Sequence, residues 1–119
     1  MKFFQKFNII EMKLKYTKYF LANVKHLKKK YKKIDQDLKN FKKYILENPT
    51  DGDTLGHGIY KVRYKNSDKN TGKSGGYRVI TYYKNQEQDI YALTIYDKSE
   101  IENIPTSRLI EILKEELGI

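Results

Sequence analysis

Three successive segments decide the fold: GIYKVRYK at 58–65, GKSGGYRVITYY at 72–83 and IYALTIYDKSEIEN at 90–103. The first two alternate apolar or aromatic residues with polar ones, and the third is almost continuously apolar up to Tyr96. Side chains two residues apart point to the same side of a β-strand, so this alternation is typical of strands with one buried face. The sequence therefore predicts a meander of three strands over this part of the chain.

The alternation also predicts which side chains share a face of the sheet. In each of the first two segments, one alternating set suits packing against helices and the other carries cations. The packing sets are Tyr60, Val62 and Tyr64, and Tyr77, Val79 and Thr81; the opposite sets are Lys61, Arg63 and Lys65, and Arg78, Ile80 and Tyr82. We expect Arg78 and Lys98 to be exposed. Strict alternation would place Tyr96 on the face of Ile90 and Ala92.

Further strand and helix patterns flank the meander. A strand is predicted at 12–16, two amphipathic helices at 17–31 and 34–48, a connecting loop at 49–58 and a final helix at 105–117. The apolar residues that carry these patterns are Met12, Leu14 and Tyr16; Phe20, Val24, Leu27 and Tyr31; Ile34, Leu38, Phe41 and Ile45; and Leu109, Ile110, Leu113 and Leu117. The predicted fold class is α+β: an N-terminal strand and a helical hairpin packed on a small, mainly antiparallel sheet, with a C-terminal helix.

The length of 119 residues fits one domain with a modest core, so we expect residues 1–119 to form a single domain. Residues 1–11 precede the first strand pattern. The sequence leaves open whether they extend that strand or form an N-terminal extension.

The charge is strongly basic and unevenly distributed. The formal net charge is +9, with +10 in residues 1–49 and −1 in residues 50–119. A basic surface gains affinity for nucleic acid by displacing counterions from phosphates. The lysine-rich first half is consistent with a solvated helix surface and with an electrostatic landing surface for RNA, the ribosome or an acidic protein.

Several classes of chemistry lack their residues. Without cysteine there are no disulfides or thiolate metal sites, which fits a reducing compartment. His26 and His57 have no close acidic partner in the sequence, and GKSGG lacks the spacing of a phosphate-binding loop. No run approaches the ~20 apolar residues of a membrane span. We expect no metal, no cofactor, no membrane association and a cytoplasmic location.

Metal-free RNA cleavage fits the residues that remain, because the 2′-hydroxyl of the RNA itself attacks the adjacent phosphate. Cations that neutralise the phosphorane, with a general acid and a general base, suffice for this reaction. The candidate cations are Lys61, Arg63, Lys73, Arg78 and Lys98. Tyr82, on the face of Arg78, is a candidate to stack on a base, and Tyr96, beside Asp97 and Lys98, is a candidate RNA contact.

With these residues in view, the chain resembles the RelE/ParE superfamily of type II toxin-antitoxin toxins, and within it the HigB-like RelE toxins. The resemblance covers roughly Met12 to Leu117. It rests on LGHGIYKVR at 55–63, GKSGGYRVITYY at 72–83 and LTIYDKSEIENI at 93–104, in that order.

The resemblance implies an mRNA interferase, an endoribonuclease that enters the ribosomal A site and cuts the codon there. It implies that Lys61 and Arg63 grip the mRNA backbone and help to activate the 2′-hydroxyl, and that Arg78 stabilises the transition state. Lys73 and Lys98 match basic positions with roles in phosphate contact or acid catalysis. The general base remains unassigned, because Pro105 and an apolar helix occupy the region where some relatives carry a tyrosine or histidine.

The implied partners are a cognate antitoxin, expected to be a small helix-turn-helix protein, together with the ribosome and mRNA. Operator DNA would be bound only through the antitoxin complex. Two alternatives stay open, because the same fold hosts other activities. One is a ParE-like gyrase inhibitor without nuclease activity, and the other is an inactive protein that only binds its antitoxin and DNA.

Overall fold

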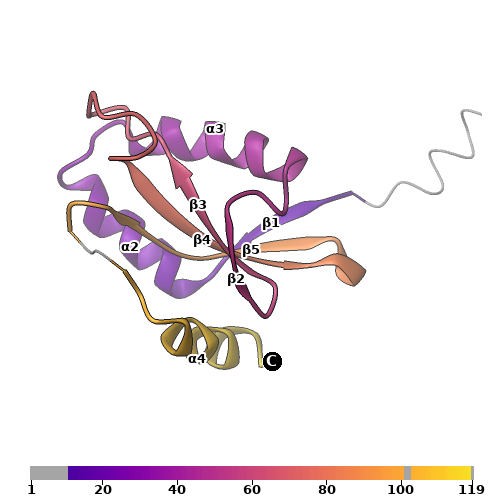
Figure 1. The fold of residues 1–119 in the computed structure, drawn as a ribbon. Helices are drawn as coiled ribbons and strands as arrows, with labels where there is room; N and C mark the ends of the chain where they lie inside the picture. Colours follow the sequence, from indigo (N-terminus) through magenta and orange to yellow (C-terminus); the bar gives the residue numbers. More distant parts are fainter. Residues whose placement is uncertain (1–10, 101–102, 119) are drawn as a thin grey trace, which may run out of the picture.

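The computed structural model describes residues 11–100 and 103–118, in which a five-stranded sheet lies between helices (Figure 1). The expected extension at 1–11 lies outside the described residues except for Glu11. Along the chain the elements are β1 (Lys13–Tyr16), α2 (Lys18–Lys28), α3 (Ile34–Glu47), β2 (Asp53–Gly56), β3 (Ile59–Tyr64), β4 (Tyr77–Lys84), η1 (Asn85–Glu87), β5 (Asp89–Asp97) and α4 (Thr106–Leu117). The α+β fold class is confirmed.

The helix ends follow from local sequence. Thr17 precedes α2, and its Oγ1 accepts a hydrogen bond from the backbone N–H of Phe20 at 3.1 Å, which satisfies one of the free donors of the first turn. Asp35 and Asp37 lie in the first turn of α3, where carboxylates favour the positive end of the helix. Gly118 ends α4 with φ at 67°, a left-handed conformation that suits glycine.

The strands lie in the order β1-β5-β4-β3-β2. β1 pairs with β5 in parallel, and every other pair of neighbours is antiparallel. β4 is thus the central strand, and β1 and β2 form the two edges. Among the described residues, no helix is long and apolar enough to cross a membrane.

Two apolar clusters cover the two faces of the sheet. The hairpin face packs against α2 and α3, and the α4 face packs against the C-terminal helix. The buried hairpin-face residues are Phe20, Leu27, Tyr31, Ile34, Phe41, Ile45, Val62, Tyr77, Val79, Ile90, Ala92 and Ile95. The buried α4-face residues are Ile59, Ile80, Tyr82, Leu93, Tyr96, Leu109, Ile112 and Leu113. The predicted alternation of β3 and β4 is confirmed.

A β-bulge in β5 moves Tyr96 to the α4 face. Ile80 of β4 pairs with Thr94 and the next residue, Thr81, pairs with Ala92, so Leu93 is an extra residue in β5. An extra residue reverses the alternation beyond it. The expectation that Tyr96 shares a face with Ile90 and Ala92 was therefore wrong, and Tyr96 lies on the face that carries the β3 and β4 cations.

We expected the whole segment 49–58 to be a loop, and that expectation was wrong in part. Asp53–Gly56 forms edge strand β2, which pairs with β3. The turn before it lies close to β3. A Cβ built on Gly52, which has φ at 98°, would come within 2.3 Å of the carbonyl oxygen of Lys61. Glycine permits both this backbone conformation and this close approach. As a result the Asp51–Asp53 turn lies beside the cationic side chains of β3.

Candidate functional site

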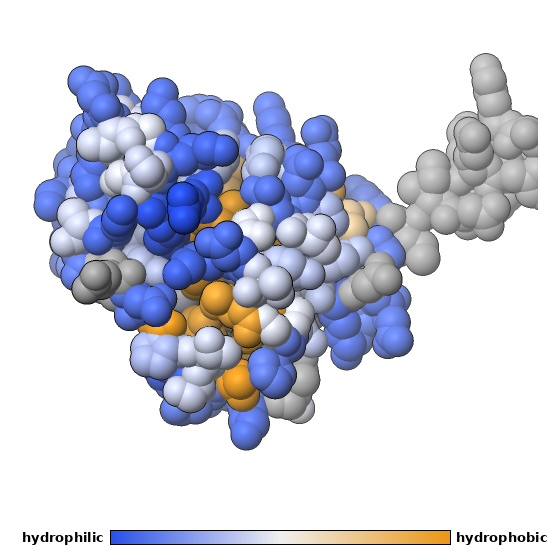
Figure 2. Space-filling view, viewed as in Figure 1, coloured by the Kyte–Doolittle hydropathy of each residue, from blue (hydrophilic) through white to orange (hydrophobic). Residues whose placement is uncertain are grey.

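A cleft of about 430 Å³ opens where three segments meet. Its lining comes from the turn before β2 and the first residue of β2, from β3 and from the loop before β4. The lining residues are Asp51, Gly52, Asp53, Lys61, Arg63, Lys73 and Ser74. In the space-filling view, most side chains in the upper part of the molecule are hydrophilic, and apolar side chains are exposed between them and α4 (Figure 2). Three of the five cations predicted from the sequence thus converge in one cleft.

The two β3 cations, Lys61 and Arg63, line the cleft, and nearby side chains neutralise little of their charge. The Arg63 side chain is 58% exposed, and its guanidinium lies 4.0 Å from the Asp53 carboxylate, itself 65% exposed. Lys61 is partly buried, pairs in register with Asp53, and donates to Asn103 Oδ1 at 3.4 Å. An exposed ion pair at this distance contributes little, so Arg63 remains available to an anion.

Asp51 and Asp53 were not predicted as part of the site, because their turn was interpreted as a connecting loop. The Tyr44 hydroxyl donates to Asp51 Oδ2 at 2.6 Å, and this hydrogen bond raises the pKa of Tyr44. Asp51 is therefore held by α3, whereas Asp53 faces the β3 cations. The register between Asp53 and Lys61 places this carboxylate at the site, and that register depends on β2, which the local sequence did not indicate.

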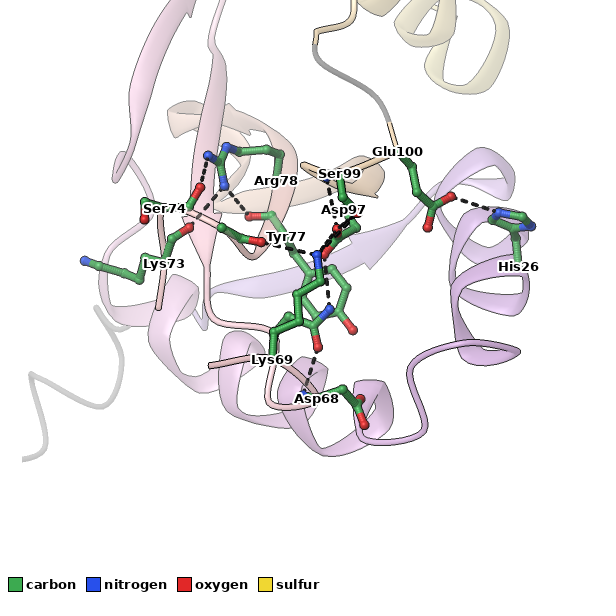
Figure 3. Close-up of polar contacts among 12 residues, drawn as sticks. His26, Asp68, Lys69, Lys73, Ser74, Tyr77, Arg78, Asp97, Ser99 and Glu100 are labelled. Atoms are coloured by element: carbon green, nitrogen blue, oxygen red, sulfur yellow. Dashed lines mark hydrogen bonds and ion pairs between the residues drawn. The ribbon is translucent and has the colours of Figure 1, made fainter. Parts of the chain in front are cut away.

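Arg78 is buried rather than exposed, so that expectation was wrong. Its side chain is only 7% exposed. Its guanidinium donates to three carbonyl oxygens, those of Lys73 at 3.1 Å, Tyr77 at 3.3 Å and Ser74 at 2.7 Å (Figure 3). The loop before β4 folds back over the start of β4, and its carbonyl groups cover the Arg78 guanidinium. Buried cations require such partners, and here the carbonyls fix the loop that carries Lys73.

Lys73 and Lys98 occupy different places. Lys73 is exposed and lines the cleft. Lys98 is exposed, as expected, directly after β5, and its backbone N–H donates to Gly76 O at 3.0 Å. Within the described residues, the lining of the cleft includes neither Lys98 nor Arg78. The backbone of Lys98 thus joins it to the loop before β4.

The rings of Tyr82 and Tyr96 are covered by α4. They are 9% and 3% exposed and belong to the apolar cluster of the α4 face. Burial raises the pKa of Tyr96, although the charge of Arg78 acts in the opposite direction, and the Tyr96 hydroxyl has no hydrogen-bond partner in the described part of the chain. The structure does not bring either ring into the cleft, so base stacking by Tyr82 and RNA contact by Tyr96 stay predictions.

The sequence did not indicate the pairing of Lys69 with Asp97, which lies beside the loop before β4. The two residues are separated by 28 positions, and Lys69 lies outside the three segments that carry the family resemblance. Among residues 11–100 and 103–118, no three His, Cys, Asp or Glu side chains are grouped to hold a metal ion.

A family model for the RelE toxin of the RelE/RelB toxin-antitoxin system matches residues 12–115, which include every strand and nearly all of α4. The chain belongs to the RelE toxin family. This RelE toxin therefore has a RelB-type antitoxin as its cognate partner. The cleft cations lie within the matched region. The HigB-like subgroup and the helix-turn-helix nature of the antitoxin stay predictions.

Proposed function

We propose that this RelE toxin is a ribosome-dependent, metal-independent endoribonuclease that cuts mRNA in the A site and so inhibits translation. Its cognate antitoxin neutralises it. We also propose that the chain belongs to the HigB-like subgroup of RelE toxins. The proposed place of the reaction is the cleft between β3, the turn before β2 and the loop before β4.

The observation that carries the proposal is the convergence of Lys61, Arg63 and Lys73 on one cleft. Its volume of about 430 Å³ falls within the range of roughly 300–1,000 Å³ that is typical of small-molecule sites. Arg63 is exposed, and its guanidinium can bind two phosphate oxygens at once. A single nucleotide with its phosphate is thus a suitable occupant by size and by charge.

In the proposed reaction the 2′-oxygen attacks phosphorus and the bond from phosphorus to the 5′-oxygen breaks. The products are a 2′,3′-cyclic phosphate and a 5′-hydroxyl. Lys61 and Arg63 stabilise the added negative charge of the phosphorane. The ammonium of Lys73 donates the proton that the leaving 5′-oxygen requires, and a base takes the 2′-hydroxyl proton. Each step needs only groups of the RNA, the toxin or the ribosome.

Arg78 and Lys98 have different roles in this proposal. Arg78 donates to the carbonyls of Lys73 and Ser74, so it acts by holding the loop rather than by touching the phosphate in this conformation. Lys98, outside the cleft lining, contacts the RNA backbone at the border of the site.

The test compares two arginine substitutions of equal chemistry. Arg63→Gln removes the exposed cation of the cleft, and Arg108→Gln removes an arginine on α4 that pairs with Glu111 and Glu115. Each protein is added to a reconstituted translation reaction with a defined mRNA, with and without ribosomes, and new 5′ ends are mapped by primer extension. We expect A-site cleavage by wild type and by Arg108→Gln that requires ribosomes, and a loss of about 10²-fold in Arg63→Gln.

Other outcomes would assign other functions. Intact mRNA together with growth arrest and DNA damage signalling would indicate a ParE-like gyrase inhibitor. Intact mRNA without toxicity would indicate a protein that only binds its antitoxin and DNA. Equal cleavage by both variants would show that the cleft is not the site.

A further inference from the structure

A buried ion pair lies under the basic loop, which we define as residues 65–76. Asp97, the last residue of β5, has a fully buried side chain, and the Lys69 side chain is 22% exposed. Lys69 Nζ donates to Asp97 Oδ2. Asp97 also accepts from Asn66 Nδ2 at 3.1 Å and from the backbone N–H of Ser99 at 3.1 Å (Figure 3).

Both members of the pair are charged. Burial acts to raise the pKa of Asp97, but hydrogen bonds from Lys69, Ser99 and Asn66 outweigh it and lower the pKa. Burial acts to lower the pKa of Lys69, but its hydrogen bond to Asp97 and the negative charge of Asp97 raise it. The Tyr31 ring, 5.5 Å from Lys69 Nζ, adds a cation-π contact.

A buried ion pair is a poor source of net stability, because desolvation of two charges offsets most of their attraction. Its better-supported use is to specify one arrangement among several. Here the pair fixes the basic loop. Asn66, near the start of the loop, and Lys69, in its middle, both bind Asp97, and Lys69 Nζ also reaches Gly75 O, near the end, at 3.5 Å.

The pair lies on the side of the sheet opposite to the cleft. Asp97 is in register with Tyr77, which belongs to the hairpin-face cluster, and residues in register share a face. Arg78, the next residue of β4, points to the α4 face, where it holds Lys73 O and Ser74 O. The basic loop therefore passes round the end of β4, anchored on one face by a buried carboxylate and on the other by a buried guanidinium.

We propose that Lys69 and Asp97 are positioning residues that hold Lys73 at the cleft, an inference that rests on the proposed function. The loop has two further anchors on the helical hairpin. Ser67 N–H donates to Asp37 Oδ2 at 2.9 Å, and Lys33 N–H donates to Asp68 Oδ2 at 3.0 Å. These anchors keep the first half of the loop in place when the ion pair is removed, whereas Lys73 and Ser74 lie in the second half, between Lys69 and its contact at Gly75.

The experiment uses the full chain with Lys69→Met, Lys69→Arg and the double change Lys69→Met with Asp97→Asn, which leaves no unpaired buried charge. Lys114→Met, at an exposed lysine of α4, is the matched control. Cleavage on programmed ribosomes gives kcat and KM, and hydrogen exchange of the amides at 70–76 reports the loop. In Lys69→Met and in the double variant we expect kcat to fall by about 10²-fold, with KM changed less than about threefold. Displacement of a catalytic group by about 1 Å is enough for such a loss.

The expected accompaniment is faster exchange at 70–76 in Lys69→Met and in the double variant, with both properties restored by Lys69→Arg and unaltered by Lys114→Met. Thermal unfolding shows which variants are folded, and the double variant keeps the test valid if Lys69→Met alone does not fold. Unchanged kcat in a folded variant would overturn the inference and leave the proposed function in place. If wild type does not cleave mRNA, the proposed function fails, and exchange at 70–76 still decides whether the pair holds the loop.

Discussion

The hairpin face and the α4 face of the sheet carry charged side chains that differ in burial and pairing. On the hairpin face, Asp97 is buried and paired with Lys69. On the α4 face, Arg63 is exposed and lies 4.0 Å from Asp53. The position of Arg63 follows from the period-two alternation of β3, whereas Asp97 reaches the hairpin face only because the bulge at Leu93 reverses the alternation of β5. The buried Asp97 fixes a loop, and the exposed Arg63 leaves its charge available to solvent. We expect ligand binding where a charged side chain is exposed and weakly paired, as at Arg63. Where charges are buried and fully paired, as in Lys69 and Asp97, we expect them to fix one conformation of the chain.

The largest expected effect is loss of stability on the hairpin face. Phe41 is 1% exposed and makes an edge-to-face contact with Tyr64 at a centroid distance of 5.2 Å. Phe41→Ala removes this packing and leaves a cavity, so we expect the free energy of unfolding to fall by about 3–5 kcal/mol. Urea denaturation measures it. A loss below ~1 kcal/mol would show that α3 packs against the sheet less tightly than the burial indicates.

The second prediction concerns acid stability of the same face. Because the pKa of Asp97 is lowered in the folded state, its contribution is complete above the unfolded value of about 3.9 and is lost as the pH falls through the folded pKa. Wild type should therefore lose stability between about pH 5 and pH 2 more steeply than Asp97→Asn. The difference between the two should be largest near neutral pH and should shrink with acid.

Urea titrations of both proteins at several pH values check this prediction. Asp35→Asn is the control, since Asp35 is an exposed carboxylate that pairs with Lys28 on the helical hairpin. Parallel curves for wild type and Asp97→Asn across this window would show that Asp97 is not held in its charged form by the pair.

The faces of β3 and β4 could be predicted from sequence, because alternation within a strand needs only local geometry. The face of Tyr96 could not, because the bulge at Leu93 is defined by the register between β5 and β4, which is a tertiary property. The same limit applies to β2. Its pairing with β3 depends on Gly52 approaching a neighbouring backbone, and composition alone indicated a loop.

The candidate site shows the same division. Lys61, Arg63 and Lys73 were predicted from their residue types, and the cleft brings them together. The burial of Arg78 depends on a loop that folds back over β4, and the pairing of Lys69 with Asp97 joins residues with no local relation. The side chains proposed to act directly on a phosphate are recognisable by type, whereas those proposed to position them are defined by contacts distant in sequence.

The third prediction tests how far the α4 face is open to anions. Asp53→Asn removes the carboxylate that lies 4.0 Å from the Arg63 guanidinium and that, under the proposed function, competes with RNA for it. Since an exposed pair contributes about 0–1 kcal/mol, we expect affinity for a short single-stranded RNA to rise by at most about fivefold at low salt, and less at high salt. Fluorescence anisotropy at two salt concentrations measures this, with Asp35→Asn as control. Weaker binding by Asp53→Asn would show that Asp53 assists RNA instead of competing with it.

The smallest expected effect compares one tyrosine from each face. Tyr77 and Tyr96 are 1% and 3% exposed, and neither hydroxyl has a hydrogen-bond partner among the described residues. Removal of an unsatisfied buried hydroxyl is close to neutral, so Tyr77→Phe and Tyr96→Phe should each change the free energy of unfolding by less than about 1 kcal/mol. Cleavage by both variants should equal that of wild type. If Tyr96→Phe alone lost cleavage while both kept their stability, the α4 face would have to open during the reaction and expose Tyr96 to the RNA.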